Sequence, residues 1–223
     1  MTQRVEIVKR IMDSNDRLAQ NNRSVLDQHQ VFGINIMASP GAGKTSVILE
    51  TIKRLPADIK LGVIEGDTAP VTIDADKIVA AGIPAVQINT GGDCHLDANM
   101  VQRALPAMNL SNLDLLIIEN VGNLICPAAF KLGVHFNIVI ASVPEGDDKP
   151  YKYPGMFRGA DVLLLNKMDL QEYMGFNVDY FRQGVEALNP GVTFFPVSCR
   201  TGEGLDAWFA WLRAQLESRS AAG

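Results

Sequence analysis

Apolar and polar positions alternate along the chain with two different spacings. Short runs of nearly continuous Ile, Val and Leu are separated by longer stretches in which apolar residues recur at helical spacing. The short runs are typical of strands in a parallel sheet covered on both faces, and the longer stretches indicate amphipathic helices. The predicted strands are Phe32–Ala38, Leu61–Glu65, Ala85–Asn89, Leu113–Ile118, Phe136–Ser142, Val162–Asn166 and Thr193–Val197. The predicted helices are Thr45–Leu55, Asp74–Ala81, Leu96–Leu105, Val178–Leu188 and Leu205–Leu216.

Strand and helix alternate through most of the chain, so we predict a doubly wound α/β fold with a mostly parallel sheet of about seven strands. In such a sheet, ligands bind at the carboxyl ends of the strands. Before the first strand, apolar residues at helical spacing predict one or two N-terminal helices; they are Val5, Val8, Ile11, Met12, Leu18 and Leu26. No internal repeat or linker interrupts the pattern. We therefore predict a helical segment over residues 1–30 and one domain over residues 31–218.

Composition narrows the class of protein. The 223 residues include 47% hydrophobic and 20% charged residues, which is ordinary for a globular domain. The net charge of −5 argues against broad binding to nucleic acid or to an anionic membrane. No apolar run approaches the roughly 20 residues that span a bilayer, and the first ten residues lack a signal-peptide core. Three cysteines make no disulfide framework, so we predict a cytoplasmic protein whose thiols stay reduced.

A glycine-rich loop joins the first predicted strand to the following helix, and it matches the P-loop pattern with alanine in place of the first glycine. Its sequence is Ala38-Ser39-Pro40-Gly41-Ala42-Gly43-Lys44-Thr45. Alanine is tolerable at that position if its φ angle is negative. A glycine-rich turn that merely caps a helix is the alternative, but such a turn does not require Lys followed by Thr. The predicted phosphate-binding residues are Gly41, Ala42, Gly43, Lys44, Thr45 and Ser46.

In this interpretation Lys44 bridges the β- and γ-phosphates and the Thr45 hydroxyl holds Mg²⁺. Glu119 ends an apolar strand, from where its carboxylate reaches Mg²⁺ directly or through water, and Gly122 offers an N–H group to the γ-phosphate. Asp67 follows another strand and offers a carboxylate for the metal or for an attacking water, although a loop or N-cap role is nearly as strong an alternative. We predict Lys44, Asp67 and Glu119 as catalytic residues, and Thr45, Asp67 and Glu119 as magnesium ligands.

The segment Asn166-Lys167-Met168-Asp169 ends a buried strand and matches the guanine-recognition motif of GTPases. The Asp169 carboxylate accepts both N1–H and the exocyclic amine of guanine, whereas adenine would leave this charged acceptor unsatisfied. Lys167 covers the base with its stem, and Asn166 ties the loop to the P-loop. Farther on, Ser198 and Cys199 follow a strand where GTPases present a backbone N–H group to the guanine oxygen. The sequence therefore predicts GTP and GDP as ligands.

Two further segments carry ligands for a transition metal. Cys94 and His95 are adjacent after one strand, and Cys126 lies seven residues after Glu119. Thiolate and imidazole suit Ni²⁺ or Zn²⁺, and both segments leave the same edge of the sheet. Three ligands are one short of a closed four-coordinate site, so a site shared across a twofold dimer is attractive. The alternative is equally open here: isolated cysteines are often core residues, and one histidine at a helix start is often a cap.

The remaining candidates receive simpler interpretations. We interpret His29 and His135 as structural, because neither has a neighbouring cysteine. Cys199 is expected to act through its backbone. The loop over residues 142–157 contains Glu145-Gly146-Asp147-Asp148 and is predicted to be functional, with no ligand assigned. No arginine is placed as an arginine finger, so we expect slow intrinsic GTP hydrolysis.

At this point the chain resembles the hydrogenase nickel-incorporation GTPases, the HypB family of the SIMIBI class of P-loop proteins, over nearly its whole length. Six strings carry the resemblance: Ser39-Pro40-Gly41-Ala42-Gly43-Lys44-Thr45-Ser46, Glu65-Gly66-Asp67, Cys94-His95-Leu96-Asp97-Ala98, Glu119-Asn120-Val121-Gly122-Asn123-Leu124-Ile125-Cys126-Pro127, Glu145-Gly146-Asp147-Asp148 and Asn166-Lys167-Met168-Asp169. The strings around Cys94 and Cys126 are highly specific.

The resemblance implies a P-loop GTPase domain with inserted metal-binding loops that dimerises with bound GTP. It implies Cys94, His95 and Cys126 as ligands of Ni²⁺ or Zn²⁺ near the dimer interface. It further implies nickel delivery to [NiFe]-hydrogenase, with a nickel-binding accessory protein and the hydrogenase large subunit precursor as partners. Two departures stand out: residues 1–30 lack a His-rich or Cys-rich motif, and Asn99 stands where some relatives have a second histidine.

Three alternatives to this function differ in what they require. An accessory GTPase for another metalloenzyme, such as urease, is disfavoured because Cys126-Pro127 continues into Ala128 rather than histidine. A GTP-binding regulatory module would have structural cysteines and would tolerate loss of Cys126. A nucleotide or sulfur-transfer kinase is disfavoured because nothing in the sequence marks an acceptor pocket.

Overall fold

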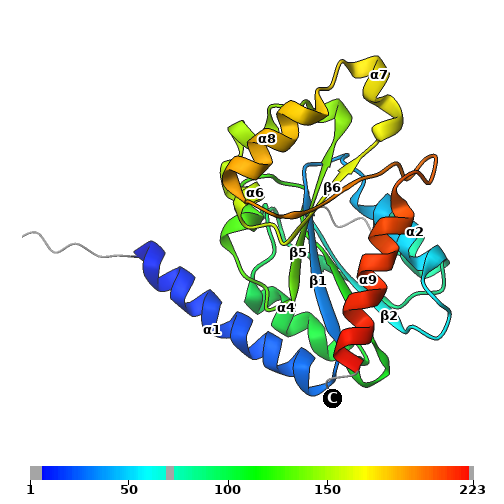
Figure 1. Cartoon of the computed structure of the whole chain (residues 1–223). Coiled ribbons are helices and arrows are strands. Elements are labelled where there is room, and N and C mark those ends of the chain that lie inside the picture. Colours follow the sequence, from blue (N-terminus) through cyan, green and yellow to red (C-terminus); the bar gives the residue numbers. More distant parts are fainter. Residues whose placement is uncertain (1–6, 69–72, 221–223) are drawn as a thin grey trace, which may run out of the picture.

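The computed structural model describes residues 7–68 and 73–220, and these fold around one parallel sheet (Figure 1). Val5 of the predicted N-terminal helix lies outside the described residues. The seven strands are β1 (Phe32–Ala38), β2 (Leu61–Asp67), β3 (Ala85–Asn89), β4 (Leu115–Glu119), β5 (Phe136–Ser142), β6 (Val162–Asn166) and β7 (Thr193–Pro196). Their order is β3-β2-β4-β1-β5-β6-β7, and every pair is parallel, which confirms the predicted doubly wound architecture.

Helices connect the strands on both faces of the sheet. They are α1 (Ile7–Gln28), α2 (Lys44–Arg54), α3 (Ile73–Ala80), α4 (Ala98–Ala104), α5 (Lys149–Lys152), α6 (Pro154–Arg158), α7 (Gln171–Met174), α8 (Val178–Leu188) and α9 (Leu205–Ser220). Short 3₁₀ helices occupy Leu105–Ala107, Leu110–Asn112, Cys126–Ala129, Val143–Glu145 and Met168–Leu170. Within the described part of the chain, no helix combines the length and apolarity needed to cross a bilayer.

Four strands have the predicted bounds, and two elements begin later than predicted for visible reasons. α4 begins at Ala98 because Asp97 is its N-cap, with the carboxylate accepting a hydrogen bond from the Met100 amide at 2.8 Å. β4 begins at Leu115 because Asp114 belongs to the preceding turn, where its carboxylate accepts from the Lys60 amide at 2.7 Å. Apolar periodicity thus predicts that these elements form, and local side-chain hydrogen bonds determine the residues at which they begin.

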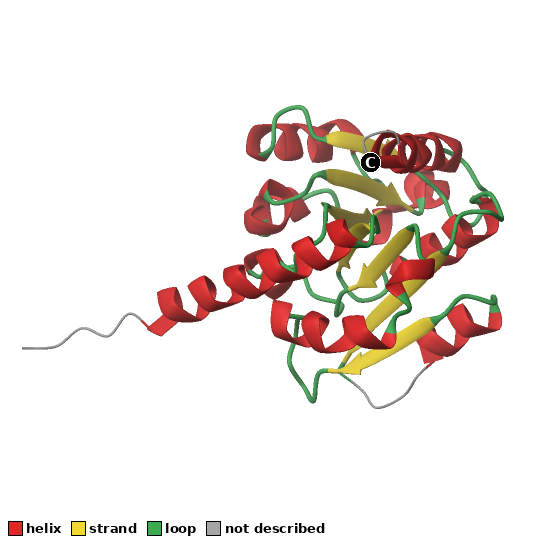
Figure 2. Cartoon of the chain, turned by 90° about the horizontal axis from the view of Figure 1, so that it is seen from below, coloured by secondary structure: helices red, strands yellow, loops and turns green. Residues whose placement is uncertain are grey.

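The core has three parts, divided by the sheet. One face of the sheet packs against α2, α3 and α9, with Trp208 of α9 fully buried among strand residues. On the opposite face, α1 and α4 cover the half around β2 and β4, and α6 and α8 cover the half around β5 and β6. Figure 2, seen from below, shows the twisted sheet between these helical layers. Burial on both faces explains why the strand sequences are almost continuously apolar.

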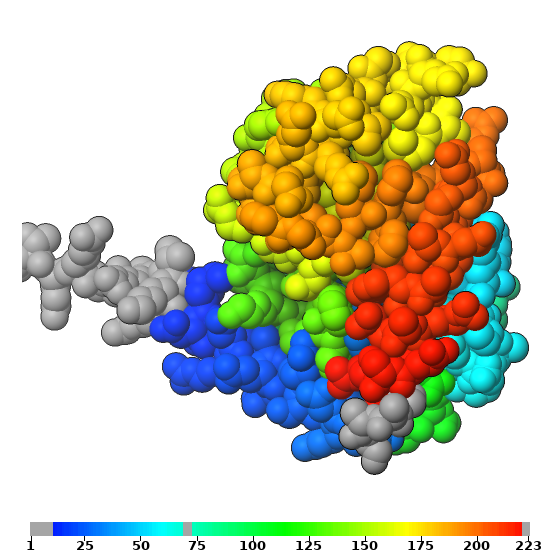
Figure 3. All heavy atoms as spheres, in the orientation of Figure 1, coloured from blue at the N-terminus to red at the C-terminus, as the bar shows by residue number. Residues whose placement is uncertain are grey.

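The N-terminal helix α1 is attached to the body by buried amides. Asn15 accepts a hydrogen bond from the Ala98 amide at 2.9 Å, and Asn22 donates to the Ala98 and Leu132 carbonyls at 2.8 and 3.0 Å. Figure 3 shows α1, in blue, lying against the green segment that contains these partners. α1 therefore holds both the start of α4 and the segment after Cys126. The division between residues 1–30 and 31–218 stays a prediction.

Candidate functional site

The loop after β1 has the backbone shape of a phosphate cradle. Gly41 and Gly43 have φ angles of 76° and 106°, a region that glycine adopts without strain. A Cβ atom on Gly43 would lie 2.4 Å from Asn166 Nδ2, so this position also requires the absence of a side chain. Ala38 ends β1 and does not have a positive φ angle, as expected for an alanine in place of the first glycine. The loop then enters α2, whose N-terminus favours anions.

Below this loop, P-loop side chains meet a buried carboxylate. The Thr45 hydroxyl donates to Glu119 Oε1 at 3.0 Å, and Lys44 Nζ lies 4.0 Å from the same oxygen. Burial raises the pKa of Glu119 to about 7, against the lowering effects of the Lys44 charge and the Thr45 hydrogen bond. The three predicted residues are therefore together, in the arrangement expected before a divalent cation binds.

A second carboxylate, Glu65 of β2, lies beside Glu119. The two residues are paired in register across β2 and β4, and Glu65 is 3% exposed. Its Oε2 atom is buried and has no hydrogen-bond partner among the described residues. Burial, together with the neighbouring Glu119 and Asp67 charges, raises the pKa of Glu65 to about 7. The buried Glu65 Oε2, near the Glu119 and Asp67 carboxylates, suits a divalent cation, because the cation would supply the missing partner.

Asp67 is the carboxylate predicted at this strand end, and the structure adds Glu65 beside Glu119. Asp67 ends β2 and is half-buried, and its backbone carbonyl accepts from the Thr90 amide at 2.9 Å. Its charge acts on Glu65. Glu65 follows a continuous apolar run just as Glu119 does, and this common position is the signal that identifies it.

The Asn-Lys-x-Asp segment leaves β6 and contacts the P-loop directly. Asn166 Nδ2 donates to the Ala42 carbonyl at 3.0 Å, and Lys167 Nζ donates to the Gly41 carbonyl at 2.6 Å. The predicted tie between Asn166 and the P-loop is therefore present. Lys167 has a φ angle of 62°, which turns the chain sharply at the strand end. Asp169 Oδ1 accepts from the Ser198 hydroxyl at 2.6 Å.

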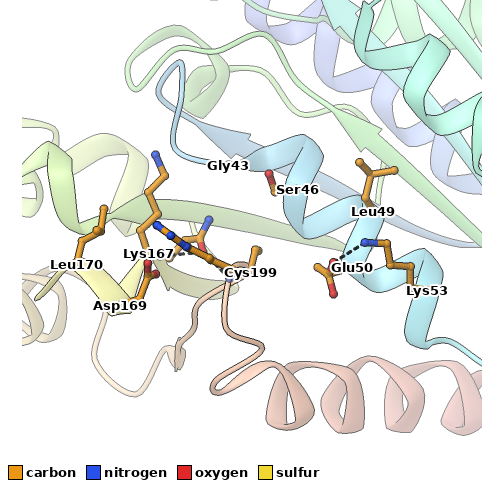
Figure 4. Close-up of a pocket in the computed structure, with 11 residues that line it drawn as sticks. Gly43, Ser46, Leu49, Glu50, Lys53, Lys167, Asp169, Leu170 and Cys199 are labelled. Carbon is orange, nitrogen blue, oxygen red and sulfur yellow. Dashed lines mark hydrogen bonds and ion pairs between the residues drawn. The ribbon is translucent and has the colours of Figure 1, made fainter.

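A cavity of about 500 Å³ opens between these segments (Figure 4). In Figure 4, Lys167 and Asp169 lie on one side of the cavity and Ser46 and Leu49 of α2 on the other, with Cys199 between them. The cavity is lined by Gly43, Ser46, Leu49, Glu50, Lys53, Asn166, Lys167, Asp169, Leu170, Cys199 and Arg200. Its location at the carboxyl ends of the strands is the one expected for a nucleotide base.

Three residues of α2 that line the cavity were not predicted from the sequence. Leu49, Glu50 and Lys53 face the cavity because they follow Ser46 at helical spacing. The helical period from Ser46 was the signal that could have found them. Cys199 contributes its amide, which donates to Asn166 Oδ1 at 3.3 Å. Burial, with the nearby Glu50 charge, raises the pKa of the Cys199 thiol to about 11, which favours the protonated thiol over the thiolate.

The loop after β5 also contacts the P-loop. The Glu145 carboxylate accepts hydrogen bonds from the hydroxyls of Ser39 and of Ser142, the latter at 2.7 Å. Glu145, the first residue of the Glu145–Asp148 segment, therefore has a structural role in holding Ser39 of the phosphate loop.

The three candidate metal ligands come together although they belong to different loops. One ligand atom from each of Cys94, His95 and Cys126 lies within 4.8 Å of the others. Cys94 Sγ is 3.8 Å from His95 Nδ1, and all three residues are half-buried. A hydrogen bond between the thiols, with burial and the Cys94 charge, raises the pKa of Cys126. Two sulfurs and one nitrogen fit Ni²⁺ or Zn²⁺ and leave room for a fourth ligand.

Neighbouring side chains hold this cluster in place. The Phe130 ring stacks on the His95 imidazole, with centroids 4.0 Å apart and an interplanar angle of 28°. Asn123 Oδ1 accepts from the Cys126 amide at 3.3 Å. The other two histidines are bonded elsewhere: His135 Nδ1 accepts from the Gly33 amide at 2.9 Å, and His29 contacts Ser111 at 3.2 Å.

The loop that carries Cys126 touches the phosphate loop. The Asn123 amide donates to the Ala38 carbonyl at 2.8 Å. A Cβ atom on Gly122 would lie 3.1 Å from three atoms of Pro40, so the two loops are in close contact there. The candidate metal cluster and the phosphate loop are thus connected through one short segment.

Taken together, the sheet and the loop that follows β1 define a nucleotide-binding protein of the P-loop class. Residues 33–196 match the family model described as "CobW/HypB/UreG, nucleotide-binding domain". The hydrogenase maturation factor HypB of Escherichia coli (strain K12) is 44% identical over 217 residues, covering 96% of this chain and 74% of that protein. The chain belongs to the HypB family of hydrogenase maturation factors.

Solved structures of this family share the fold. A crystal structure of HypB from Helicobacter pylori in complex with nickel superposes with a TM-score of 0.87 at 36% identity, covering 92% of this chain and 96% of that one. A crystal structure of HypB from Archaeoglobus fulgidus gives a TM-score of 0.85 at 40% identity. The match covers 92% of this chain and 99% of that one.

Proposed function

We propose that this chain is a magnesium-dependent GTPase that binds Ni²⁺ or Zn²⁺ at Cys94, His95 and Cys126 and delivers nickel during [NiFe]-hydrogenase maturation. The observation that carries the proposal is the position of the metal cluster. Cys126 lies on the loop that continues from Glu119 and contacts the P-loop through the Asn123 amide, 2.8 Å from the Ala38 carbonyl. A change at the phosphates therefore has a short path to the metal ligands.

In the proposed nucleotide site, Lys44 contacts the β- and γ-phosphates, and the Gly122 amide contacts the γ-phosphate. Thr45, Glu119 and Asp67 hold Mg²⁺, which neutralises the charge that develops on the phosphates. Glu65, whose buried Oε2 has no hydrogen-bond partner among the described residues, joins this set directly or through water. The Asp169 carboxylate selects guanine by accepting its two N–H donors, and the loop at Ser198 and Cys199 presents a backbone N–H group to the guanine oxygen.

The nucleotide cycle works in this proposal as a switch on dimerisation. GTP orders the segments after Glu65 and Glu119, and two subunits then pair and share the metal site, which completes the coordination that three ligands leave open. Hydrolysis to GDP loosens the pair and releases the metal ion. Because a ligand shifts only states that it distinguishes, metal affinity must then differ between the GTP and GDP forms.

Two relatives support nickel delivery to hydrogenase as the function. The Escherichia coli relative is a hydrogenase maturation factor, and the Helicobacter pylori structure was obtained in complex with nickel. We propose a nickel-binding accessory protein and the hydrogenase large subunit precursor as partners. The proposed site of action is the cytoplasm, where the cluster thiols stay reduced.

A titration tests this function. Purified protein is loaded with GDP or with a non-hydrolysable GTP analogue, titrated with Ni²⁺ and Zn²⁺, and its mass is determined in each state. We expect a dimer with the GTP analogue, with close to one ion per dimer, and a metal affinity that changes with the nucleotide. Absence of Ni²⁺ and Zn²⁺ binding in both states contradicts the nickel-delivery function and favours a GTP-binding regulatory module.

Two cysteine variants locate the site. Cys126→Ala should weaken Ni²⁺ binding by more than about 10–100-fold, the loss seen when only an outer partner of a metal ligand is removed. Cys199→Ala is the matched control, because Cys199 lies at the base cavity with a pKa of about 11. Equal loss in both variants, or in neither, would place the metal elsewhere.

A further inference from the structure

Three asparagine side chains form a connected row across the middle of the sheet. Asn120 Nδ2 donates to Asn35 Oδ1 at 3.2 Å, and Asn35 Nδ2 donates to Asn137 Oδ1 at 3.1 Å. Asn35 and Asn120 are 1% and 0% exposed. A buried amide costs free energy unless it is hydrogen-bonded, so such a row holds one arrangement firmly.

Asn120 ends this row and holds both ligand-bearing segments through one atom. Its Oδ1 accepts from the Leu96 amide at 3.0 Å and from the Val121 amide at 3.0 Å. Leu96 follows His95 directly, and Val121 begins the segment that leads to Cys126. One carbonyl oxygen thus fixes the backbone beside His95 relative to the start of the Cys126 loop.

The same residue is attached to the nucleotide site through the backbone. Asn120 is bonded covalently to Glu119, whose carboxylate accepts from Thr45 at 3.0 Å and lies 4.0 Å from Lys44 Nζ. The Asn120 amide donates to the Ile36 carbonyl of β1 at 2.9 Å, two residues before the phosphate loop. A displacement of Glu119 therefore reaches Asn120 without an intervening flexible segment.

An apolar contact supports the same connection from the neighbouring strand. Leu96 is fully buried, and a Cβ atom on Gly66 would lie 2.7–2.8 Å from three of its carbon atoms. Gly66 lies between Glu65 and Asp67. The Leu96 side chain, directly after His95, is consequently packed against the end of β2 that carries Glu65 and Asp67.

We propose that Asn120 is the positioning residue that couples the nucleotide state to the geometry of the metal cluster. This inference rests on the function proposed above. When nucleotide binding draws Lys44 to the phosphates and leaves Glu119 and Thr45 to a cation, Glu119 shifts and Asn120 moves with it. The Cys94–His95 segment and the Cys126 loop then move together, because the Leu96 and Val121 amides both donate to Asn120 Oδ1. Without the Asn120 side chain, the two segments respond to the nucleotide independently.

The test compares the ratio of Ni²⁺ dissociation constants in the GDP and GTP-analogue forms of wild type, Asn120→Ala and Asn123→Ala. Coupling between two sites is typically about 5–150-fold. We expect the ratio of dissociation constants to lie in that range for wild type and close to one for Asn120→Ala. Ni²⁺ should still bind to Asn120→Ala. The thiolate-to-nickel absorption band should differ between nucleotide forms in wild type and coincide in Asn120→Ala.

Asn123→Ala is the matched control, because the Asn123 side chain holds the Cys126 amide from the same loop but has no hydrogen bond to Leu96 among the described residues. It should weaken Ni²⁺ in both nucleotide forms by a similar factor and keep the wild-type ratio. A purely structural role for Asn120 would give the same pattern in Asn120→Ala and would overturn the inference while leaving the nickel function standing. A ratio of one in wild type overturns both.

Should Asn120→Ala fail to fold, Asn35→Ala provides a second reading. It removes the partner of Asn120 Nδ2 but leaves the bonds from Leu96 and Val121 to Oδ1 available. We expect its ratio of Ni²⁺ dissociation constants to lie between the wild-type ratio and one. A wild-type ratio in a folded Asn35→Ala protein contradicts the proposed coupling.

Discussion

The nucleotide site and the metal cluster lie at the same edge of the sheet but are held together in different ways. In the nucleotide site, side chains bond directly to remote segments: Asn166 Nδ2 donates to the Ala42 carbonyl at 3.0 Å, and the Ser198 hydroxyl donates to Asp169 at 2.6 Å. In the metal cluster, the three ligand atoms lie within 4.8 Å of one another, with 3.8 Å between Cys94 Sγ and His95 Nδ1. Their positions depend on backbone bonds and on one aromatic stack.

This difference separates a preorganised site from an adjustable one. A site whose side chains are locked by their own hydrogen bonds needs little reorganisation when its ligand arrives. Three half-buried ligands on two loops reach a final geometry only with the ion, and they can change that geometry when a neighbouring segment moves. The metal binding and release proposed for this chain require the second arrangement.

The largest expected effect is on the nucleotide site, which is the preorganised one. Lys44→Ala should lower kcat for GTP hydrolysis by about 10²–10³-fold, because it removes the charge aimed at the developing phosphate charge. Phosphate release under single-turnover conditions measures it. Lys131→Ala is the control, since Lys131 pairs with Asp16 on the surface. An unchanged rate in Lys44→Ala would remove the P-loop lysine from the mechanism.

Asp169→Asn should reduce affinity for GDP on the order of 10²-fold, because the amide cannot accept both guanine donors. Xanthosine diphosphate should bind this variant better than it binds wild type, since xanthine has a carbonyl where guanine has the amine. Competition against a fluorescent nucleotide measures both values. The metal cluster should be unaffected, and equal GDP affinity in both proteins would contradict the assignment of Asp169.

The paired carboxylates predict a pH dependence of the nucleotide-free, metal-free protein. Glu65 and Glu119 have folded-state pKa values of about 7, raised by burial, so the folded state binds more protons than the unfolded state between about pH 4.5 and 7. The free energy of unfolding should therefore fall as pH rises through that window. Glu65→Gln should flatten the decrease, measured as Tm in chelator.

The control for this measurement is Glu217→Gln on the exposed face of α9. It should reproduce the wild-type slope of Tm against pH. If the slope of Glu65→Gln also equals that of wild type, the two acids do not share a buried site.

The smallest expected effect is at the adjustable site. Phe130→Leu removes an aromatic stack worth about 0.5–1.5 kcal/mol, so Ni²⁺ affinity should fall by a few-fold, up to about tenfold. Phe136→Leu is the control, because Phe136 packs edge-on against Trp211, away from the cluster. GDP affinity should stay unchanged in both. A Phe130→Leu protein with wild-type Ni²⁺ affinity would show that the imidazole needs no such support.

Prediction from the sequence succeeded where the signal is local. The strands Phe32–Ala38 and Val162–Asn166 have their predicted bounds, and the Asn-Lys-x-Asp segment lies against the P-loop as expected. It was less complete where a contact crosses strands. Asp67 as a magnesium ligand stays a prediction, and the register of β2 and β4 adds Glu65 beside Glu119. Register depends on the neighbouring strand, which no local pattern contains.

By itself, the sequence determined the α/β class, the phosphate loop, the Asn-Lys-x-Asp segment and the candidate metal-ligand strings around Cys94 and Cys126, because each of these signals is a local pattern in the chain. Only the tertiary structure decided the strand order, the shared burial of Glu65 and Glu119, the Phe130 stack on His95 and the bond from Leu96 to Asn120. These contacts join residues far apart in sequence, and packing of the whole sheet selects them from many pairings that local preference allows.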